Sequence, residues 1–211
     1  MSPIESIPNR QGQQHIGAIV LAAGASTRLG EPKQLIRIDG VPLIVRIATA
    51  ALDSPLWPIV IVVGANAVEV RSELARPPVL IAENSAWIEG MASSLRTGMA
   101  TLQSFSRRLD GALIALCDQP AFTSKTIARL LDNAPVPLEG HIVASQYQGR
   151  LGAPALFSRT YFSALSNLSG EEGARHVIAA ARLTNHVVPV DLPEMAIDLD
   201  TPADIARLKN R

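Results

Sequence analysis

The chain has 211 residues, of which 47% are hydrophobic and 18% are charged, and 19 basic side chains balance 19 acidic ones. This length and apolar content suit one packed domain and exclude a disordered chain. A net charge of zero argues against a general nucleic-acid binder, and no apolar run is long enough to cross a membrane. The single cysteine, Cys117, excludes an intrachain disulfide and suits a reducing compartment, so we expect a cytoplasmic protein.

Residues 1–14 are polar and lack the apolar stretch of a secretory signal, so we expect a flexible leader before one domain over residues 15–211. Up to residue 133, apolar runs alternate with stretches of helical spacing. The runs predict strands at 15–22, 58–63, 79–82 and 111–117. The helical spacing predicts helices at 41–52, 67–75, 90–105 and 123–133, with Asn66 and either Thr123 or Ser124 as N-caps.

The second part of the chain has a looser rhythm. A Gly-containing turn separates predicted strands at 141–145 and 153–157, and a further strand is expected at 187–190. Helices are expected at 158–168, 172–182 and 202–209, the last with Thr201 as its cap. Strands that alternate with helices, several of them continuously apolar, predict an α/β fold with three layers and a mostly parallel, Rossmann-like sheet.

The segment that follows the first strand, Leu21 to Lys33, is rich in groups that bind anions. Small residues let backbone N–H groups approach a phosphate chain, hydroxyls add donors, and cations supply charge. An ordinary strand-to-helix connection needs only about 2–6 residues. The segment therefore predicts a polyphosphate site, with these candidate ligands: Leu21, Ala22, Ala23, Gly24, Ser26, Thr27, Arg28, Gly30 and Lys33.

Two common phosphate-binding patterns do not fit this segment. A Walker loop requires Gly-Lys-Ser/Thr, whereas Gly30 is followed by Glu31-Pro32-Lys33. The dinucleotide fingerprint requires a second glycine where Ser26 stands. A nicotinamide-dependent dehydrogenase is therefore disfavoured.

Six ordered motifs carry a resemblance to a known family. They are Leu21 to Lys33, Asn84 to Leu95, Leu116 to Pro120, Gly149 to Phe157, Gly170 to Arg175 and Asp198 to Pro202. Together they resemble the MobA-like nucleotidyltransferases of molybdenum cofactor synthesis, and most closely the cytidylyltransferase branch. The resemblance covers residues 16–208 and implies the nucleotide-diphospho-sugar transferase fold.

The resemblance implies a reaction in which a nucleotidyl group passes to an acceptor phosphate and pyrophosphate leaves. Mg²⁺ is the expected ion, because it binds through one or two carboxylates and phosphate oxygens. Asp118 follows a buried strand, and either Asp198 or Asp200 would be the second carboxylate, because residues two apart on a strand point the same way. Arg28 and Lys33, with Asp118, are the expected catalytic residues.

The family motifs also imply further binding residues. Asn84, Gly90 and Ser94 are expected to contact the nucleotide, and the acceptor is expected to contact Gln119, Gly152, Pro154, Gly173 and Arg175. Within the family, alanine at Ala23 goes with cytidylyl transfer and glycine with guanylyl transfer. A Cβ there narrows the pocket, so CTP is favoured over GTP. The implied acceptor is molybdopterin carrying molybdenum, and a molybdoenzyme or a maturation protein is the implied partner.

Purely structural roles remain open for several of these residues. Asp118 could be a turn residue, Asp200 only a helix cap, and Trp87 a core aromatic. Cys117 is expected to be buried and inert, Glu171 and Glu172 to be helix-start charges, and the histidines have no metal-ligand spacing. Ala153 and Glu171 depart from the family pattern and leave the acceptor open. Alternatives are a guanylyltransferase, a nucleotidyltransferase for another small phosphate, and a non-catalytic protein that binds and delivers the cofactor.

Overall fold

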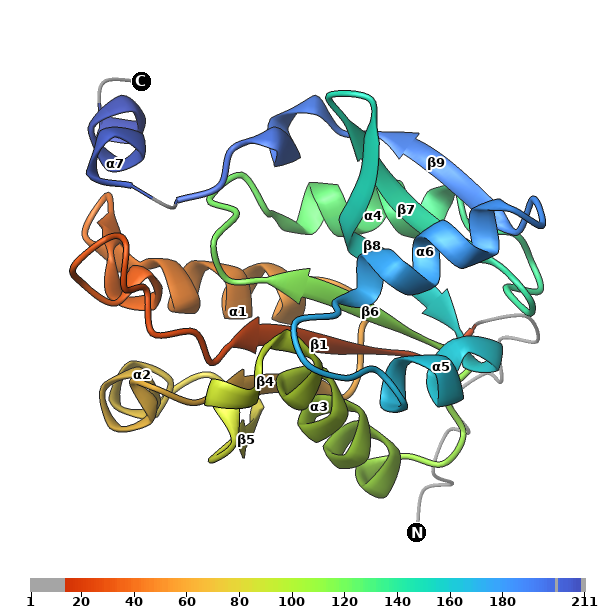
Figure 1. The fold of residues 1–211 in the computed structure, drawn as a ribbon, viewed down its shortest axis with the longest axis horizontal. Helices are drawn as coiled ribbons and strands as arrows, with labels where there is room; N and C mark the ends of the chain where they lie inside the picture. The colour runs from red at the N-terminus through yellow and green to blue at the C-terminus, as the bar shows by residue number, and fades with distance from the viewer. Residues whose placement is uncertain (1–13, 200, 210–211) are drawn as a thin grey trace, which may run out of the picture.

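The computed structural model describes residues 14–199 and 201–209. They form a seven-stranded sheet in the order β5–β4–β1–β6–β8–β7–β9 (Figure 1). In this part of the chain β8 alone runs antiparallel to its neighbours, so the sheet is mostly parallel as predicted. The strands are β1 (Ile16–Ala22), β4 (Ile59–Val63), β5 (Leu80–Glu83), β6 (Gly111–Leu116), β7 (Ile142–Tyr147), β8 (Arg150–Ser158) and β9 (Val187–Asp191).

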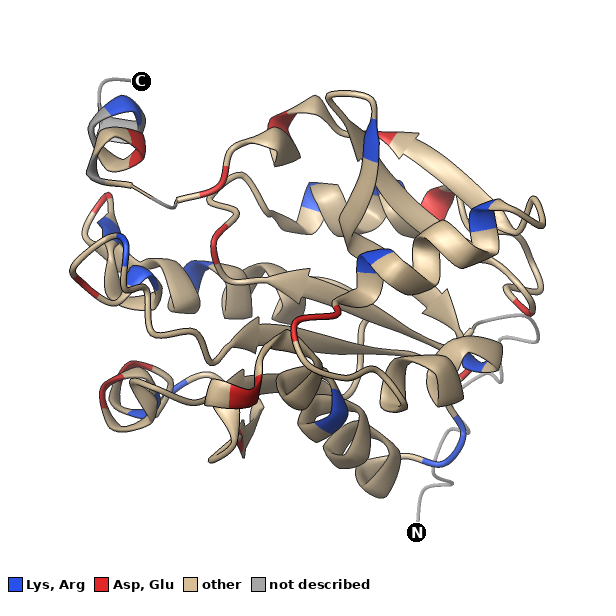
Figure 2. Ribbon diagram, in the orientation of Figure 1, with Lys and Arg blue, Asp and Glu red and all other residues tan. Residues whose placement is uncertain are grey.

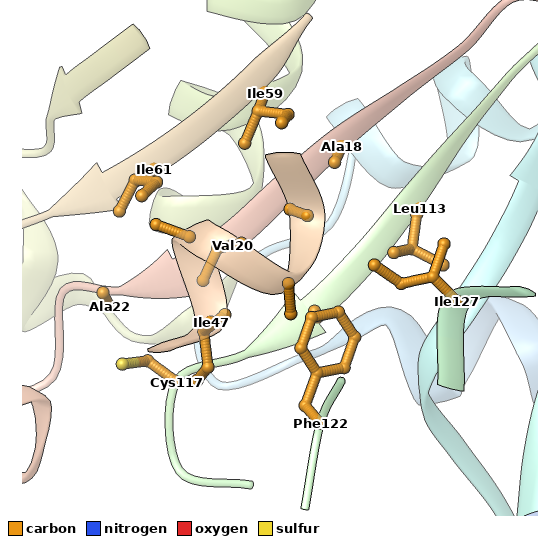
Figure 3. Packing of buried hydrophobic residues seen from close by; sticks show 14 of the residues in the cluster. Ala18, Val20, Ala22, Ile47, Ile59, Ile61, Leu113, Cys117, Phe122 and Ile127 are labelled. Carbon is orange, nitrogen blue, oxygen red and sulfur yellow. The ribbon is translucent and has the colours of Figure 1, made fainter. Parts of the chain in front are cut away.

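Two helical layers cover the sheet, because its central strands are apolar on both faces. Figure 3 shows Ala18, Val20 and Ala22 of β1 turned toward the layer that contains α1. Ile19 points the other way, into the second core. Alternate side chains of a strand lie on opposite faces, so a continuous apolar run fills both cores.

The first layer consists of α1 (Leu43–Leu52), α2 (Ala67–Glu73) and α4 (Ser124–Asp132). The second consists of α3 (Met91–Phe105), α5 (Phe162–Ser166) and α6 (Ala174–Arg182). The final helix, α7 (Pro202–Lys209), lies beside the loop that follows β1 in Figure 1, and Ile205 packs against the first core. The three-layer α/β prediction is confirmed.

Several element boundaries differ from the prediction. The expected helix over 41–52 starts only at Leu43, because β3 (Val41–Pro42) first pairs with β2 (Arg37–Ile38) in a small hairpin. The helix expected over 158–168 begins with a 3₁₀ turn at Arg159–Tyr161. Thr123 caps α4 as predicted, whereas the Asn66 side chain forms no capping bond to α2.

The expectation that Asp198 lies on a strand is wrong. β9 ends at Asp191, and Pro193, which has no N–H for a sheet ladder, starts a 3₁₀ turn at Pro193–Ala196. Asp198 follows this turn in an extended connection toward α7. Asp200, like the predicted leader up to residue 13, lies outside the described residues.

Charged side chains are spread over the elements, and Figure 2 shows acidic and basic segments interspersed in this view. Within residues 14–199 and 201–209, no helix has the length and hydropathy required to cross a membrane. Because acidic and basic side chains are interspersed, positive charge that binds an anion is expected only at a local site.

Candidate nucleotide and phosphate site

The carboxyl ends of β1 and β6 lie side by side at one edge of the sheet. The two strands pair in parallel register from Ile16 with Gly111 to Leu21 with Leu116. In Figure 1 the arrowheads of both strands point toward the side where the loop after β1 and α7 lie. In open α/β sheets, ligands bind beyond this edge.

The loop after β1 folds back on Ser26. The Ser26 carbonyl accepts hydrogen bonds from the N–H groups of Leu29 and Gly30, and its hydroxyl oxygen accepts one from the Lys33 N–H at 3.1 Å. Ser26 has a φ of 56° and Gly30 one of 80°, a left-handed conformation that glycine adopts without strain. Because the loop closes on Ser26, the segment from Gly24 to Lys33 brings small residues and a cation together.

Lys33 and Asp118 form the central ion pair of this edge. Lys33 Nζ donates to Asp118 Oδ2 at 2.7 Å, and each side chain is 19% exposed. The other carboxylate oxygen, Asp118 Oδ1, is buried and has no hydrogen-bond partner among the described residues. A buried carboxylate oxygen without a donor is costly, which makes this atom a candidate ligand for a cation.

The segment that holds Asp198 is fastened to Asp118. The Leu199 N–H donates to the Asp118 carbonyl at 2.9 Å. Burial raises the pKa of the Tyr147 phenol, and the negative charges of Asp198 and Asp118 raise it further. Asp198 directly precedes Leu199, so the chain brings two of the three predicted metal ligands to the same edge of the sheet.

A cavity of about 250 Å³ opens at this edge, and a smaller hollow of about 140 Å³ adjoins it. Gly24 and Lys33 line both. The cavity wall includes Leu21, Ala22, Ala23, Gln34, Trp87, Gly90, Met91, Ser94, Leu116, Cys117, Asp118 and Glu171. The hollow is lined by Ser26, Thr27, Arg28, Leu29 and Leu199. Most of the predicted nucleotide residues thus lie around two adjoining spaces.

Asn84 has a different surrounding from the one expected of a nucleotide ligand. It is 4% exposed, and its amide nitrogen donates to the hydroxyls of Ser93 and Ser94 at 2.8 and 3.0 Å. Its amide oxygen accepts from the Ala86 N–H. In the described structure Asn84 lies behind the cavity wall and holds Ser94, which does line it.

Gly90 is shaped by a contact with another loop. Its φ is 107°, and a Cβ there would lie 2.4 Å from the Gly170 carbonyl oxygen. The same carbonyl accepts a hydrogen bond from the Ala92 N–H. The loop over residues 169–173 is thereby packed on the start of α3, and Glu171 is carried into the cavity wall.

The predicted acceptor residues fall into two groups. Gln119 is 1% exposed, and its amide nitrogen donates to the carbonyls of Ala153 and Met195, so its side chain lies inside the protein. Gly152 leaves room for Tyr147, since a Cβ would lie 2.7 Å from the phenol oxygen. Pro154 follows a cis peptide bond, and its carbonyl accepts from the Ser145 hydroxyl.

The second group lies at the start of α6. Gly173 is the N-cap residue and is packed on Met91, because a Cβ would lie 2.7 Å from its sulfur. Arg175 is exposed on the first turn of the helix. Glu172 accepts two hydrogen bonds from Ser169, as expected of a charge near a helix start, whereas Glu171 lines the cavity.

Two polar residues of this edge, Gln34 and Tyr147, are absent from the sequence prediction. Gln34 lines the cavity, and Tyr147 lies near both carboxylates. Gln34 stands directly after Lys33, which was its only sequence signal. The contact of Tyr147 with Gly152 depends on the pairing of β7 with β8, which no local pattern shows.

The remaining candidates have structural surroundings. Burial and the neighbouring Asp118 charge raise the pKa of the Cys117 thiol well above its ordinary value, so this cysteine is buried and inert as expected. His141 and His186 contact each other edge to face. In the described part of the chain, no three His, Cys, Asp or Glu side chains form a metal-binding group.

A larger cavity, of about 660 Å³, lies at the opposite end of the sheet. Its wall includes Asp110, which precedes β6, and Arg159, which follows β8. None of the six sequence motifs contributes to its described lining. We therefore take the motif-lined cavity as the candidate site, although it is the smaller of the two.

Comparisons with known proteins identify the family of the chain. The family described as the MobA-like NTP transferase domain matches residues 18–194. Nicotine blue oxidoreductase of Paenarthrobacter nicotinovorans is 30% identical over 203 residues, covering 92% of this chain and 96% of that protein. The crystal structure of Rv0371c from Mycobacterium tuberculosis H37Rv in complex with manganese is 28% identical, with a TM-score of 0.73, and covers 92% of this chain and 98% of that one.

A nucleotidyl transferase structure from Methanothermobacter is similar in fold. It has a TM-score of 0.78 at 21% identity, with 94% of this chain and 97% of that chain covered. At this identity the likeness concerns the fold alone. It confirms the nucleotide-diphospho-sugar transferase architecture that the motifs implied.

Proposed function

Because this chain belongs to the family of MobA-like NTP transferase domains, we propose that it is a metal-dependent cytidylyltransferase. In this proposal it transfers CMP from CTP to the phosphate of molybdenum-loaded molybdopterin. The products are molybdopterin cytosine dinucleotide and pyrophosphate. The observation that carries the proposal is the Lys33–Asp118 pair, which lies between the loop after β1 and the Asp198 segment.

The chain's own residues suit a divalent ion at this pair. Asp118 Oδ1 is buried without a donor in the described structure, and Asp198 precedes Leu199, whose N–H donates to the Asp118 carbonyl. Two carboxylates completed by phosphate oxygens are the donor set that Mg²⁺ prefers. A bound ion would neutralise charge on the triphosphate. The manganese complex of the related Rv0371c supports a divalent ion, and Mg²⁺ is our choice among such ions.

The remaining work is positioning and neutralisation of charge, since phosphoryl and nucleotidyl transfer ask little covalent chemistry of a protein. The small residues from Ala22 to Gly24 let the backbone approach the phosphates. Lys33 Nζ, 2.7 Å from Asp118 Oδ2, would stabilise charge on the α-phosphate, and the exposed Arg28 would hold the leaving pyrophosphate in the smaller hollow. Asp198 would complete the metal site.

The choice of CTP rests on the wall of the cavity. Ala23 lines it and is 5% exposed, and Gly64 lies against both Ala23 and Trp87, since a Cβ built at Gly64 would be 2.8 Å from the Ala23 Cβ and 2.9 Å from the Trp87 Cβ. A side chain here narrows the space for a base, which favours a pyrimidine. GTP is the second candidate nucleotide.

The acceptor is the least constrained part of the proposal. Gly152, Pro154, Gly173 and Arg175 are the chain's candidates for its binding, and Tyr147 adds a hydroxyl near the carboxylates. Another small phosphate is the alternative acceptor. A protein that only binds and delivers the cofactor is the alternative of a different class.

The Asp118→Ala variant separates enzyme from binding protein. We expect pyrophosphate release with Mg²⁺, CTP and molybdenum-loaded molybdopterin to fall at least about a hundredfold, because a charge-stabilising group is lost. Asp132→Ala, at the exposed end of α4, is the matched control and should keep the wild-type rate. Release by Asp118→Ala at the wild-type rate would contradict the metal role.

A further inference from the structure

Each member of the Lys33–Asp118 pair is followed in the sequence by a buried glutamine. Gln34 and Gln119 are both 1% exposed. In each, the amide nitrogen donates to two backbone carbonyls: those of Gln34 lie in the loop after β1, and those of Gln119 lie in two distant segments. In each, the amide oxygen is buried without a hydrogen-bond partner among the described residues. The same arrangement therefore occurs on both sides of the central ion pair.

Gln34 fastens the loop after β1. Its amide nitrogen donates to the carbonyls of Ala22 and Gly24, both at 2.8 Å. The preceding Lys33 donates its backbone N–H to the Ser26 hydroxyl. Residues 33 and 34 together hold residues 22, 24 and 26, which are alternate positions of the segment expected to surround the phosphates.

Gln119 fastens the other side. Its amide nitrogen donates to the carbonyl of Ala153 at 3.1 Å and to that of Met195 at 3.2 Å. The preceding Asp118 accepts the Leu199 N–H on its own carbonyl. Residues 118 and 119 together hold positions 195 and 199, and Asp198 lies between these two contacts. Ala153 connects the same glutamine to β8 and to Pro154.

An amide NH₂ group has two hydrogens, and two carbonyl acceptors use both of them. The orientation of each glutamine is thereby fixed, and its oxygen has no hydrogen-bond partner among the described residues. The Tyr147 hydroxyl shares the Ala153 carbonyl with Gln119. An apolar side chain of equal size would avoid that cost but would release two carbonyls at once. The hydrogen bonds to two carbonyls, and not packing alone, therefore explain why each position is a glutamine.

We propose that Gln34 and Gln119 are a pair of positioning residues with separate tasks. Gln34 sets the nucleotide loop against Lys33, and Gln119 sets the Asp198 segment and β8 against Asp118. This assigns Gln119 a role inside the protein in place of the direct contact with the acceptor that the motif implied. The inference rests on the proposed function, because it assigns the nucleotide to one side of the pair.

Gln34→Met and Gln119→Met test the two tasks, since methionine is close to glutamine in size and has no donor. Gln103→Met, at an exposed position of α3, is the control. Nucleotide affinity is measured by calorimetry with CTP at saturating Mg²⁺. We expect Gln34→Met to weaken it about ten- to a hundredfold, and Gln119→Met and the control to stay within about threefold of the wild type.

Hydrogen exchange followed by mass spectrometry tests the same division without any ligand. Gln34→Met should speed exchange over residues 22–32 and leave 192–199 unchanged, and Gln119→Met should do the reverse. A merely structural role would lower the melting temperature and speed exchange in both segments for both variants, which would overturn the proposal. Equal losses of CTP affinity in the two variants would also overturn it.

The outcomes also separate this inference from the proposed function. The two variants could show the expected segment-specific exchange while the wild-type protein binds no CTP. That result would reject the cytidylyltransferase and keep the two positioning roles. CTP binding that Gln34→Met leaves unchanged would keep the nucleotide site and reject the positioning role. If a methionine variant does not fold, Gln34→Leu and Gln119→Leu replace it, because leucine also lacks the donors and carries no charge.

Discussion

The Lys33 and Asp118 side chains show how a local arrangement makes a site without an excess of charge on the whole protein. They stand 85 positions apart in the sequence and meet at 2.7 Å because β1 and β6 are neighbours in the sheet. A cation and a carboxylate at equal partial exposure neutralise each other until a ligand arrives. In the proposed function, an incoming triphosphate would offer Lys33 a new partner, and the Asp118 carboxylate could then offer its oxygens to a metal.

In the proposed function, the choice of nucleotide depends on Ala23. Replacing Ala23 with glycine removes a buried methyl group from the cavity wall. We expect Ala23→Gly to shift the ratio of kcat/KM for CTP over GTP toward GTP by about tenfold, the size expected for one methyl group. Steady-state pyrophosphate release with each nucleotide measures this. A ratio unchanged from the wild type would show that the base is read elsewhere.

Cys117 gives a prediction about pH. Burial, and then the Asp118 charge, raise its thiol pKa, so the native protein keeps the proton where an unfolded chain has lost it. The contribution of this thiol to the free energy of unfolding is greatest below the ordinary pKa of a thiol. It falls as the pH rises above that value, because the native state then binds more protons than the unfolded state. Iodoacetamide at pH 8 should modify the unfolded protein rapidly and the native protein hardly at all. Comparable labelling of both forms would contradict the burial.

At the scale of elements, two loops are built around glycines for different reasons. Gly90 has a positive φ, and a Cβ there would meet Gly170. Gly24 lines both spaces of the site, and a Cβ there would meet nothing within 4 Å. One glycine is required by the fold, and the other leaves space for a ligand.

This difference predicts opposite effects of alanine at the two positions. Gly90→Ala should lower the free energy of unfolding by about 2–4 kcal/mol through backbone strain and overlap with Gly170. Gly24→Ala should leave stability within about 0.5 kcal/mol and should weaken CTP binding, because its methyl group occupies the phosphate side. Urea denaturation and calorimetry on the two variants measure both quantities. A Gly24→Ala variant with wild-type affinity would place the phosphates elsewhere.

Elements with a strong local pattern could be predicted from the sequence. Continuous apolar runs predicted β1, β4 and β6, and helical spacing predicted α1, α3 and α4. The β2–β3 hairpin escaped prediction because each strand has only two residues. The prediction of a strand at Asp198 is wrong, because alternate residues face the same way only within a strand and β9 ends at Asp191, before the 3₁₀ turn.

The candidate site was predictable to the extent that its residues follow strands directly. The loop after β1 and Asp118 do so, and parallel pairing brings them together. Gln34, Tyr147 and the internal position of Gln119 depend on contacts between segments far apart in the sequence. No periodicity or spacing indicates such contacts, so these residues were missed or assigned to another role.

At the scale of the whole molecule, the site joins elements from both ends of the chain. The loop after β1 and the Leu199 segment line the same hollow, so a ligand there would contact segments that are far apart in the sequence. Binding of this kind stabilises the folded state by mass action. We expect CTP with Mg²⁺ at about a hundred times its Kd to raise the melting temperature by about 5–10 °C. Inorganic sulfate at the same concentration is the control, and an equal shift with sulfate would indicate binding of anions in general.

The most direct test of the account is pyrophosphate release by the purified wild-type protein with Mg²⁺. CTP and GTP are compared, each with and without molybdenum-loaded molybdopterin. We expect pyrophosphate release only when CTP and the pterin are both present. Release with GTP in place of CTP would contradict the assignment of Ala23. Tight binding of CTP without release would contradict the transfer reaction and favour a protein that binds and delivers the cofactor.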